Sequence, residues 1–220
     1  MVTKRSPARV LVKVLGALAL VASVAFLIMR TARSARSEPY TLPPEALGSW
    51  TLSLETPTAP DDPTGPVLVL LPPRPLSQAL FDQTFKRAME SMRAPDTQGI
   101  ALALQGELAR PGAARITPDE LLQLARRAGL ESAAPAARCV GHRHLPEPDT
   151  REQAFFAIFD SPAFVTFRKE LGARLGPSFD AGFVSPVMFI GIVESSMSRW
   201  QPLHIDPETD CLAPIVSAGR

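Results

Sequence analysis

The chain has 220 residues, of which 23 are Lys or Arg, 22 are Asp or Glu and two are Cys, and its formal net charge is +1. The first 37 residues hold seven of the basic side chains and no acidic ones, which leaves 16 basic and 22 acidic side chains, a net −6, for the remainder. Such an acidic domain lacks the positive surface that DNA or RNA binding needs, so we expect no nucleic-acid partner. This length suffices for the core of one domain without metal ions or several disulfides.

Residues 10–29 form a nearly unbroken apolar run, VLVKVLGALALVASVAFLIM. Twenty helical residues span about 30 Å, the thickness of a bilayer's hydrocarbon core. The run therefore predicts an uncleaved transmembrane anchor. The alternatives are a buried soluble helix or a cleaved secretory signal. A signal needs small residues before its cleavage point, whereas Arg33 precedes the nearest small pair, Ser34–Ala35.

Basic residues flank the run on both sides and predict its orientation. The four that precede or enter it outnumber the three that follow it; they are Lys4, Arg5, Arg9 and Lys13 against Arg30, Arg33 and Arg36. By the positive-inside tendency, residues 1–9 form a cytoplasmic tail and the domain lies on the extracytoplasmic side. Because the chain has 23 prolines and no asparagine, we infer a GC-rich bacterial genome. The expected location is the bacterial inner membrane, with a periplasmic domain.

After the anchor, we expect a juxtamembrane linker at residues 30–46, one domain at 47–215 and a tail at 216–220. Apolar or alternating runs predict strands at residues 50–54, 67–71, 100–104, 138–144, 153–159 and 187–193, with a last edge strand at 200–205 and a loose chain beyond Pro214. The strands alternate with helices, which favours an α/β fold with a mixed sheet of about five to six strands and three helices; an α+β fold is the alternative.

The first predicted helix covers residues 78–93 after a Ser77 cap, with Phe81, Phe85, Ala88 and Met92 as its apolar stripe. Together with the strands at 67–71 and 100–104, it predicts a right-handed parallel strand–helix–strand unit.

Two further helices have clear end signals. Thr117 and Glu120 form a capping box before a helix at 118–128, and Gly129 follows its last turn. Asp160 or Ser161 caps the third helix, which begins at Pro162, ends at Gly176–Pro177 and has Phe164, Phe167, Leu171 and Leu175 as its stripe.

All cysteines and histidines lie in two short segments. Cys139 and Cys211 predict one disulfide, as expected in an oxidising compartment; two free thiols are the alternative. His142, His144 and His204 are weak candidates for metal ligands. Strand alternation places His142 and His144 on one face and Cys139 on the other, so we predict no metal site.

Neither a nucleophile elbow nor a phosphate-binding loop is found in the sequence, so we predict no catalytic residue and no cofactor and lean against an enzyme. The expected function is that of a single-pass membrane-anchored protein whose extracytoplasmic domain acts by binding, as an accessory or structural subunit of a membrane or envelope complex. Its expected partners are the bilayer, through residues 10–29, and membrane or envelope proteins. Trp50 and Trp200 are weak contact candidates, with a place at the edge of the core as the alternative. The other function considered is an extracytoplasmic enzyme or metal-binding domain that uses His142, His144 and His204.

Overall fold

The structure is a computed structural model in which the chain divides into two compact units, Met1–Glu38 and Pro39–Arg220. It describes residues 18, 20–26, 37–56, 63–88, 90–95, 98–110, 114–144, 153–193 and 204–217. In the first unit, residues 20–26 are helical and exposed, while most of the predicted anchor at 10–29 lies outside the described residues. Among the residues that are described, no helix has the length and apolar character needed to cross a membrane.

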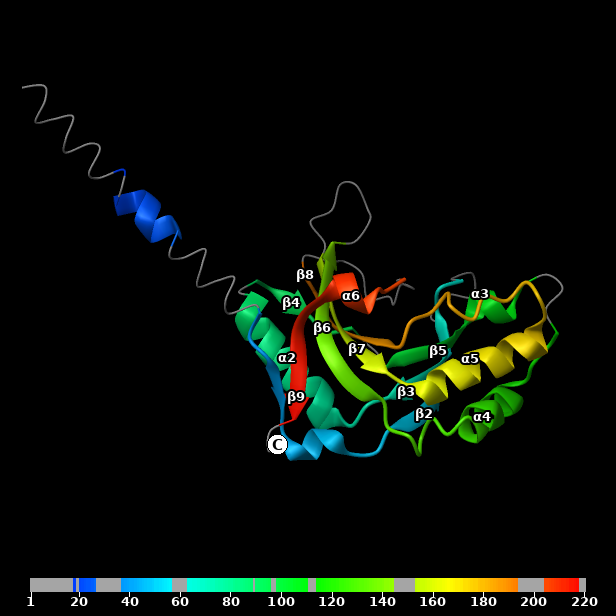
Figure 1. Cartoon of the computed structure of the whole chain (residues 1–220). Helices are drawn as coiled ribbons and strands as arrows, with labels where there is room; N and C mark the ends of the chain where they lie inside the picture. Colours follow the sequence, from blue (N-terminus) through cyan, green and yellow to red (C-terminus); the bar gives the residue numbers. More distant parts are fainter. Residues whose placement is uncertain are drawn as a thin grey trace, which may run out of the picture. The chain divides into compact units, whose positions relative to one another are not determined.

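The second unit is a single mixed α/β domain (Figure 1). In its described part, nine strands form one sheet in the order β1-β9-β6-β7-β8-β5-β3-β2, and β4 pairs with β8 beside this path. The strands are β1 Tyr40–Leu42, β2 Thr51–Leu54, β3 Pro66–Leu71, β4 Met92–Arg93, β5 Ile100–Leu104, β6 Ala136–His144, β7 Gln153–Asp160, β8 Val187–Val193 and β9 Cys211–Ser217. The helices are η1 Pro44–Leu47, α2 Arg74–Ala88, α3 Gln105–Leu108, α4 Pro118–Arg127, α5 Pro162–Leu175 and α6 Pro207–Asp210. The mixed sheet was predicted; three of its strands and three of these helices were not.

The chain adopts regular structure earlier than predicted, because β1 and the first three residues of η1 fall within the expected linker at 30–46. β1 pairs in parallel with β9, and Tyr40 and Leu42 are buried. The amide of Gln83, on α2, accepts a hydrogen bond from Thr41 N at 3.0 Å and donates one to Thr41 O at 2.8 Å. This side chain satisfies the free backbone edge of β1, as a neighbouring strand would.

Helix α2 differs from its prediction in both its ends and its buried face. It begins at Arg74 and ends at Ala88, so Ser77 lies inside it and not at its cap. The buried positions follow a four-residue step from Leu76 to Leu80, whereas Phe85 is 48 % exposed. The neighbouring prolines that precede Arg74 end β3 and allow the helix to start early.

The predicted parallel arrangement of β3 and β5 is wrong, because the two strands pair antiparallel. The residues after α2 form β4, which pairs with β8 and was predicted to be helical. Ile100, at the start of β5, lies opposite Leu70, near the end of β3, while both β4 and β5 pair antiparallel with β8.

Helices α4 and α5 confirm their predicted ends. The hydroxyl oxygen of Thr117 accepts from Glu120 N, and the Glu120 carboxylate accepts from Thr117 N, as in a capping box. The Ser161 hydroxyl oxygen accepts from Phe164 N at the start of α5. The two helices lie side by side at one end of the sheet, and α2 lies at the other (Figure 1).

The C-terminal segment differs most from its prediction. Residues 200–203 lie outside the described residues, 204–206 form no strand, and the chain that was expected to be loose beyond Pro214 belongs to β9. β9 pairs with β6 through its first half and with β1 through its second. Pro214, which has no N–H to donate, lies where one ladder gives way to the other, so it does not break the strand.

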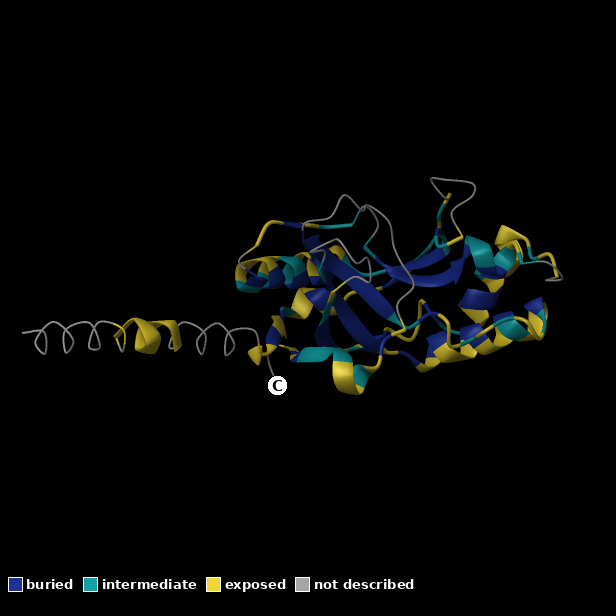
Figure 2. Ribbon diagram, turned by 90° about the horizontal axis from the view of Figure 1, so that it is seen from above, coloured by how far each residue is buried: buried dark blue, intermediate teal, exposed yellow. Residues whose placement is uncertain are grey.

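The central strands β5, β7 and β8 are buried on both faces (Figure 2). One large apolar cluster joins α2, α4 and α5 to one face, and a smaller one that includes Cys139, Phe156 and Ile205 lies on the opposite face of β6, β7 and β8. Alternate residues of β7 point into the two clusters, as strand geometry requires. The smaller cluster contains Cys139 and Ile205, and Cys211 packs against it.

Candidate functional site

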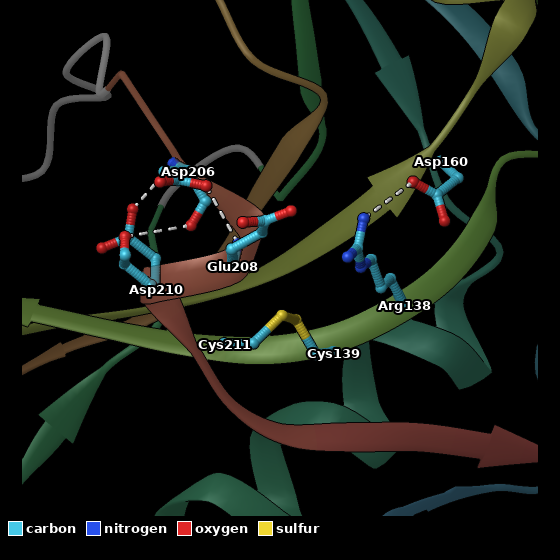
Figure 3. Close-up of a disulfide and its surroundings, with 8 residues drawn as sticks. Arg138, Cys139, Asp160, Asp206, Glu208, Asp210 and Cys211 are labelled. Carbon is cyan, nitrogen blue, oxygen red and sulfur yellow. Dashed lines mark hydrogen bonds and ion pairs between the residues drawn. A yellow bond between two sulfur atoms is a disulfide. The ribbon is translucent and has the colours of Figure 1, made fainter.

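A disulfide joins Cys139 of β6 to Cys211 at the start of β9, which confirms the predicted bridge (Figure 3). Its Cα atoms are 5.7 Å apart, and 72 residues separate the two positions. Gly141, directly opposite Cys211 in the strand pair, permits this close approach, because a Cβ there would overlap the Phe156 ring and the Asp210 carbonyl. The disulfide thus attaches the C-terminal segment to the centre of the sheet.

Next to the disulfide, Arg143 holds the segment that carries α6. Its guanidinium donates to Asp210 Oδ2 at 2.5 Å and to the backbone carbonyl of His204 at 2.8 Å. Asp210 Oδ2 also accepts from Asp206 N at 2.8 Å. Burial of Asp210 raises its pKa, but these hydrogen bonds and the positive charge of Arg143 more than offset burial and hold the pKa below its usual value.

The three histidines are not brought together. The rings of His142 and His144 are 5.4 Å apart on the face of β6 opposite Arg143, and His142 packs against Phe155 at 4.8 Å. His204 follows the other face, where its carbonyl accepts from Arg143. Within the described part of the chain, no three His, Cys, Asp or Glu side chains are grouped so that they could hold a metal ion.

Trp50 lies in the core and not on a contact surface; a place at the edge of the core was the alternative prediction for it. Only 3 % of the residue is exposed, and its ring packs edge-to-face against Phe159 with centroids 5.3 Å apart. The indole therefore offers no contact surface to a partner. Trp200 lies outside the described residues.

An apolar hollow of about 320 Å³ opens where β7 meets α5, next to the segment that the disulfide and Arg143 hold. Three stretches of chain line it: Ile158–Pro162 with Val165, Ser185–Pro186, and Ile205 with Pro207. Val165 is 49 % exposed and forms part of the apolar wall. Both serine hydroxyls already accept backbone hydrogen bonds, Ser161 from Phe164 and Ser185 from Ile205, so they add little polarity.

The rim of the hollow carries negative charge. Asp160, whose side chain is 64 % exposed, is 3.7 Å from Arg138, and the exposed Asp206 and Glu208 lie along the segment beside it (Figure 3). The sequence did not predict this site, because its walls come from separate stretches that only the fold brings together.

No family model, curated protein or solved structure matches the chain. The candidate site is therefore identified by its chemistry alone. The volume of the hollow is near the lower end of the range for ligand pockets, about 300–1,000 Å³. It can hold one large apolar side chain or a small apolar molecule, next to acidic groups that favour a positive charge.

Proposed function

We propose that the chain is a membrane-anchored binding protein of the bacterial inner membrane, with residues 10–29 in the bilayer and the folded domain on the extracytoplasmic side. The disulfide between Cys139 and Cys211 supports this location, because disulfides persist in oxidising compartments and are rare in the cytosol. The proposed role is that of an accessory or structural subunit of a membrane or envelope complex.

The observation that carries the binding role is the apolar hollow beside the disulfide. Its walls belong to β7, α5 and a segment held by one covalent bond and by the two contacts of Arg143. A rigid apolar recess can accept a partner's side chain without reordering its own walls, which lowers the entropic cost of binding. The acidic rim favours a partner with Lys or Arg next to the inserted apolar residue.

The proposed anchor would tether the folded domain to the bilayer. Ten residues, 30–39, separate the apolar run from Tyr40, where β1 begins. A stretch of this length spans at most about 35 Å even when fully extended. We therefore expect the partner to be a membrane protein or an envelope protein that approaches the membrane surface.

The test replaces an exposed valine in the wall of the hollow and an exposed valine elsewhere. Val165→Asp places a charge in the recess, whereas Val216→Asp changes a β9 residue of similar exposure, 43 % against 49 %, that does not line it. The full chain and both variants are purified from the native membrane in mild detergent. In a second pair of variants, a photo-crosslinking residue replaces the valine at position 165 or at position 216.

We expect position 165 to form a discrete crosslink to a membrane or envelope protein, and position 216 to form none. We also expect Val165→Asp, but not Val216→Asp, to release that same protein from the purified complex. Equal crosslinking at both positions, or retention of the partner by Val165→Asp, would contradict binding at the hollow.

A further inference from the structure

A second hollow, about 220 Å³ in volume, lies between α4 and α5 and has the opposite chemistry. Three arginines line it, and each comes from a different stretch of chain. Arg127 lies in the last turn of α4, Arg174 in the last turn of α5, and Arg115 in the extended segment that precedes α4. The fold therefore brings the positive charge of Arg174 next to those of Arg115 and Arg127, which lie just before α4 and at its end.

The α4 side of this hollow follows helical spacing. Glu120, Gln123 and Arg127 are three and four residues apart, so they lie along one face of the helix. Arg174 is near enough to contribute to a lowered pKa of Glu120, after the larger effects of the backbone and side-chain hydrogen bonds with Thr117. The two helices thus present their charged residues to the same space.

Glu120 is the one acidic residue in the lining, and its carboxylate is already used in the capping box. It accepts from Thr117 N at 2.8 Å and from the Thr117 hydroxyl at 3.0 Å. In the described part of the chain, none of the three arginines forms a hydrogen bond or an ion pair. By contrast, the adjacent Arg126 is paired with Glu131 at 3.5 Å.

We propose that this hollow binds a phosphate group. Three arginines and one glutamate leave two positive charges in the lining, and a phosphate monoester carries about −1.5 to −2 at neutral pH. Guanidinium groups recognise phosphate oxygens through paired hydrogen bonds, so three of them can engage one tetrahedral group from different sides. The volume lies below the range for drug-sized ligands and fits a terminal phosphate and not a whole nucleotide.

The proposal concerns the folded domain and does not depend on the proposed anchor or on binding at the apolar hollow. The phosphate can be free in solution or be the monoester headgroup of a lipid such as phosphatidic acid, since both present three terminal oxygens and a similar charge. The charge of the site also stands out from its surroundings, because the chain after residue 37 has a net charge of −6 from 16 basic and 22 acidic side chains.

The test titrates inorganic phosphate into the full chain in uncharged detergent at low ionic strength, with isothermal calorimetry as the readout. We expect one saturable site whose affinity falls with added salt. Arg127→Ala and Arg174→Ala should each weaken binding by about tenfold or more, as expected for the loss of a charged hydrogen bond. Arg126→Ala is the matched control, since it removes the same charge from the neighbouring position, and should change affinity by less than about twofold.

Thermal unfolding checks that the variants are folded; because all the replaced side chains are exposed, we expect unchanged midpoints. Absence of saturable phosphate binding by the folded wild-type chain, or equal weakening by Arg126→Ala and Arg127→Ala, would overturn the proposal. Reconstitution in phosphatidylcholine, with or without phosphatidic acid, then distinguishes the sources, because only phosphatidic acid has a phosphate monoester headgroup. Loss of free-phosphate binding only in the phosphatidic acid bilayer assigns the site to a headgroup, and unchanged binding assigns it to a soluble phosphate.

Discussion

Two arginines of α5, Arg168 and Arg174, lie six residues apart and have opposite surroundings. Arg168 is 1 % exposed, and its guanidinium makes two hydrogen bonds to Glu107, at 2.6 and 2.9 Å. It also donates to three backbone carbonyls, those of Leu102, Asp180 and Ala181. Every donor position of this guanidinium has a partner from the protein.

Arg174 is exposed, lines the second hollow and has no hydrogen bond or ion pair among the described residues. Arg143 is intermediate, with its side chain 34 % exposed and two partners on the segment that carries α6. The comparison shows that partners are supplied wherever burial makes an unpaired charge costly. The arginines of the second hollow are under no such requirement, so their charges are available to the phosphate group proposed above.

The largest expected effect is that of breaking the buried pair. Arg168→Met leaves the Glu107 carboxylate, 2 % exposed, without its counter-charge, and we expect a loss of about 3–5 kcal/mol in the free energy of unfolding. Arg174→Met, on the same helix, should change it by no more than about 0.5 kcal/mol. Denaturant unfolding of the full chain in detergent, followed by tryptophan fluorescence, measures both.

A double variant separates loss of the pair from loss of packing. Because the cost in Arg168→Met comes mainly from an unpaired buried carboxylate, Arg168→Met combined with Glu107→Leu should recover most of the lost stability. Similar losses in Arg168→Met and Arg174→Met would show that burial does not distinguish the two arginines and would remove the basis of the comparison.

The disulfide gives a further test of the segment that Arg143 holds, because its partner Asp210 directly precedes Cys211. Reduction of the wild-type chain should lower the free energy of unfolding by about 2–4 kcal/mol, because the bridge closes a loop across a separation of 72 residues. The same reductant should not affect a Cys139→Ala, Cys211→Ala double variant. Alkylation of both thiols in protein taken directly from cells, before any reduction, would contradict the bridge and the extracytoplasmic location together.

The features that the sequence predicts correctly depend on short-range signals. The capping box of Thr117 and Glu120 and the Ser161 cap define helix starts through contacts three residues apart, and the structure reproduces both. The disulfide follows from the count of two cysteines and the expectation of an oxidising compartment. Each needs no knowledge of the rest of the fold.

The features that the sequence misses depend on distant pairing. β1 pairs Tyr40 with Ile215 across most of the chain, and neither short segment looks like a strand alone, since Pro214 is typical of a strand break. The antiparallel direction of β3 and β5 likewise goes with distant pairing, since β4 and β5 both pair with β8. Both hollows are lined by three or more separate stretches, so no local pattern marks them.

The smallest expected effect concerns Asp210, the partner of Arg143. Because its pKa is held below the ordinary value of 3.8, the folded chain releases this proton more readily than the unfolded chain does. The unfolded state then binds more protons as the pH falls below about 4, so the contribution of Asp210 to stability is complete above that pH and is lost as the pH falls through the folded-state pKa. Its size should be about 1 kcal/mol, since the pair is only partly buried.

The free energy of unfolding is measured for the wild type and for Asp210→Asn from about pH 3 to about pH 7, a range that includes the ordinary carboxyl pKa of about 4. We expect their difference in stability to be constant above about pH 5 and to shrink toward acid. Asp160→Asn is the control, because its side chain is 64 % exposed and lies 3.7 Å from Arg138, so its curve should stay close to that of the wild type. If the two curves were parallel, the charge of Asp210 would make no pH-dependent contribution to stability through Arg143. Arg143 would then resemble Arg174 and would not be intermediate between Arg168 and Arg174.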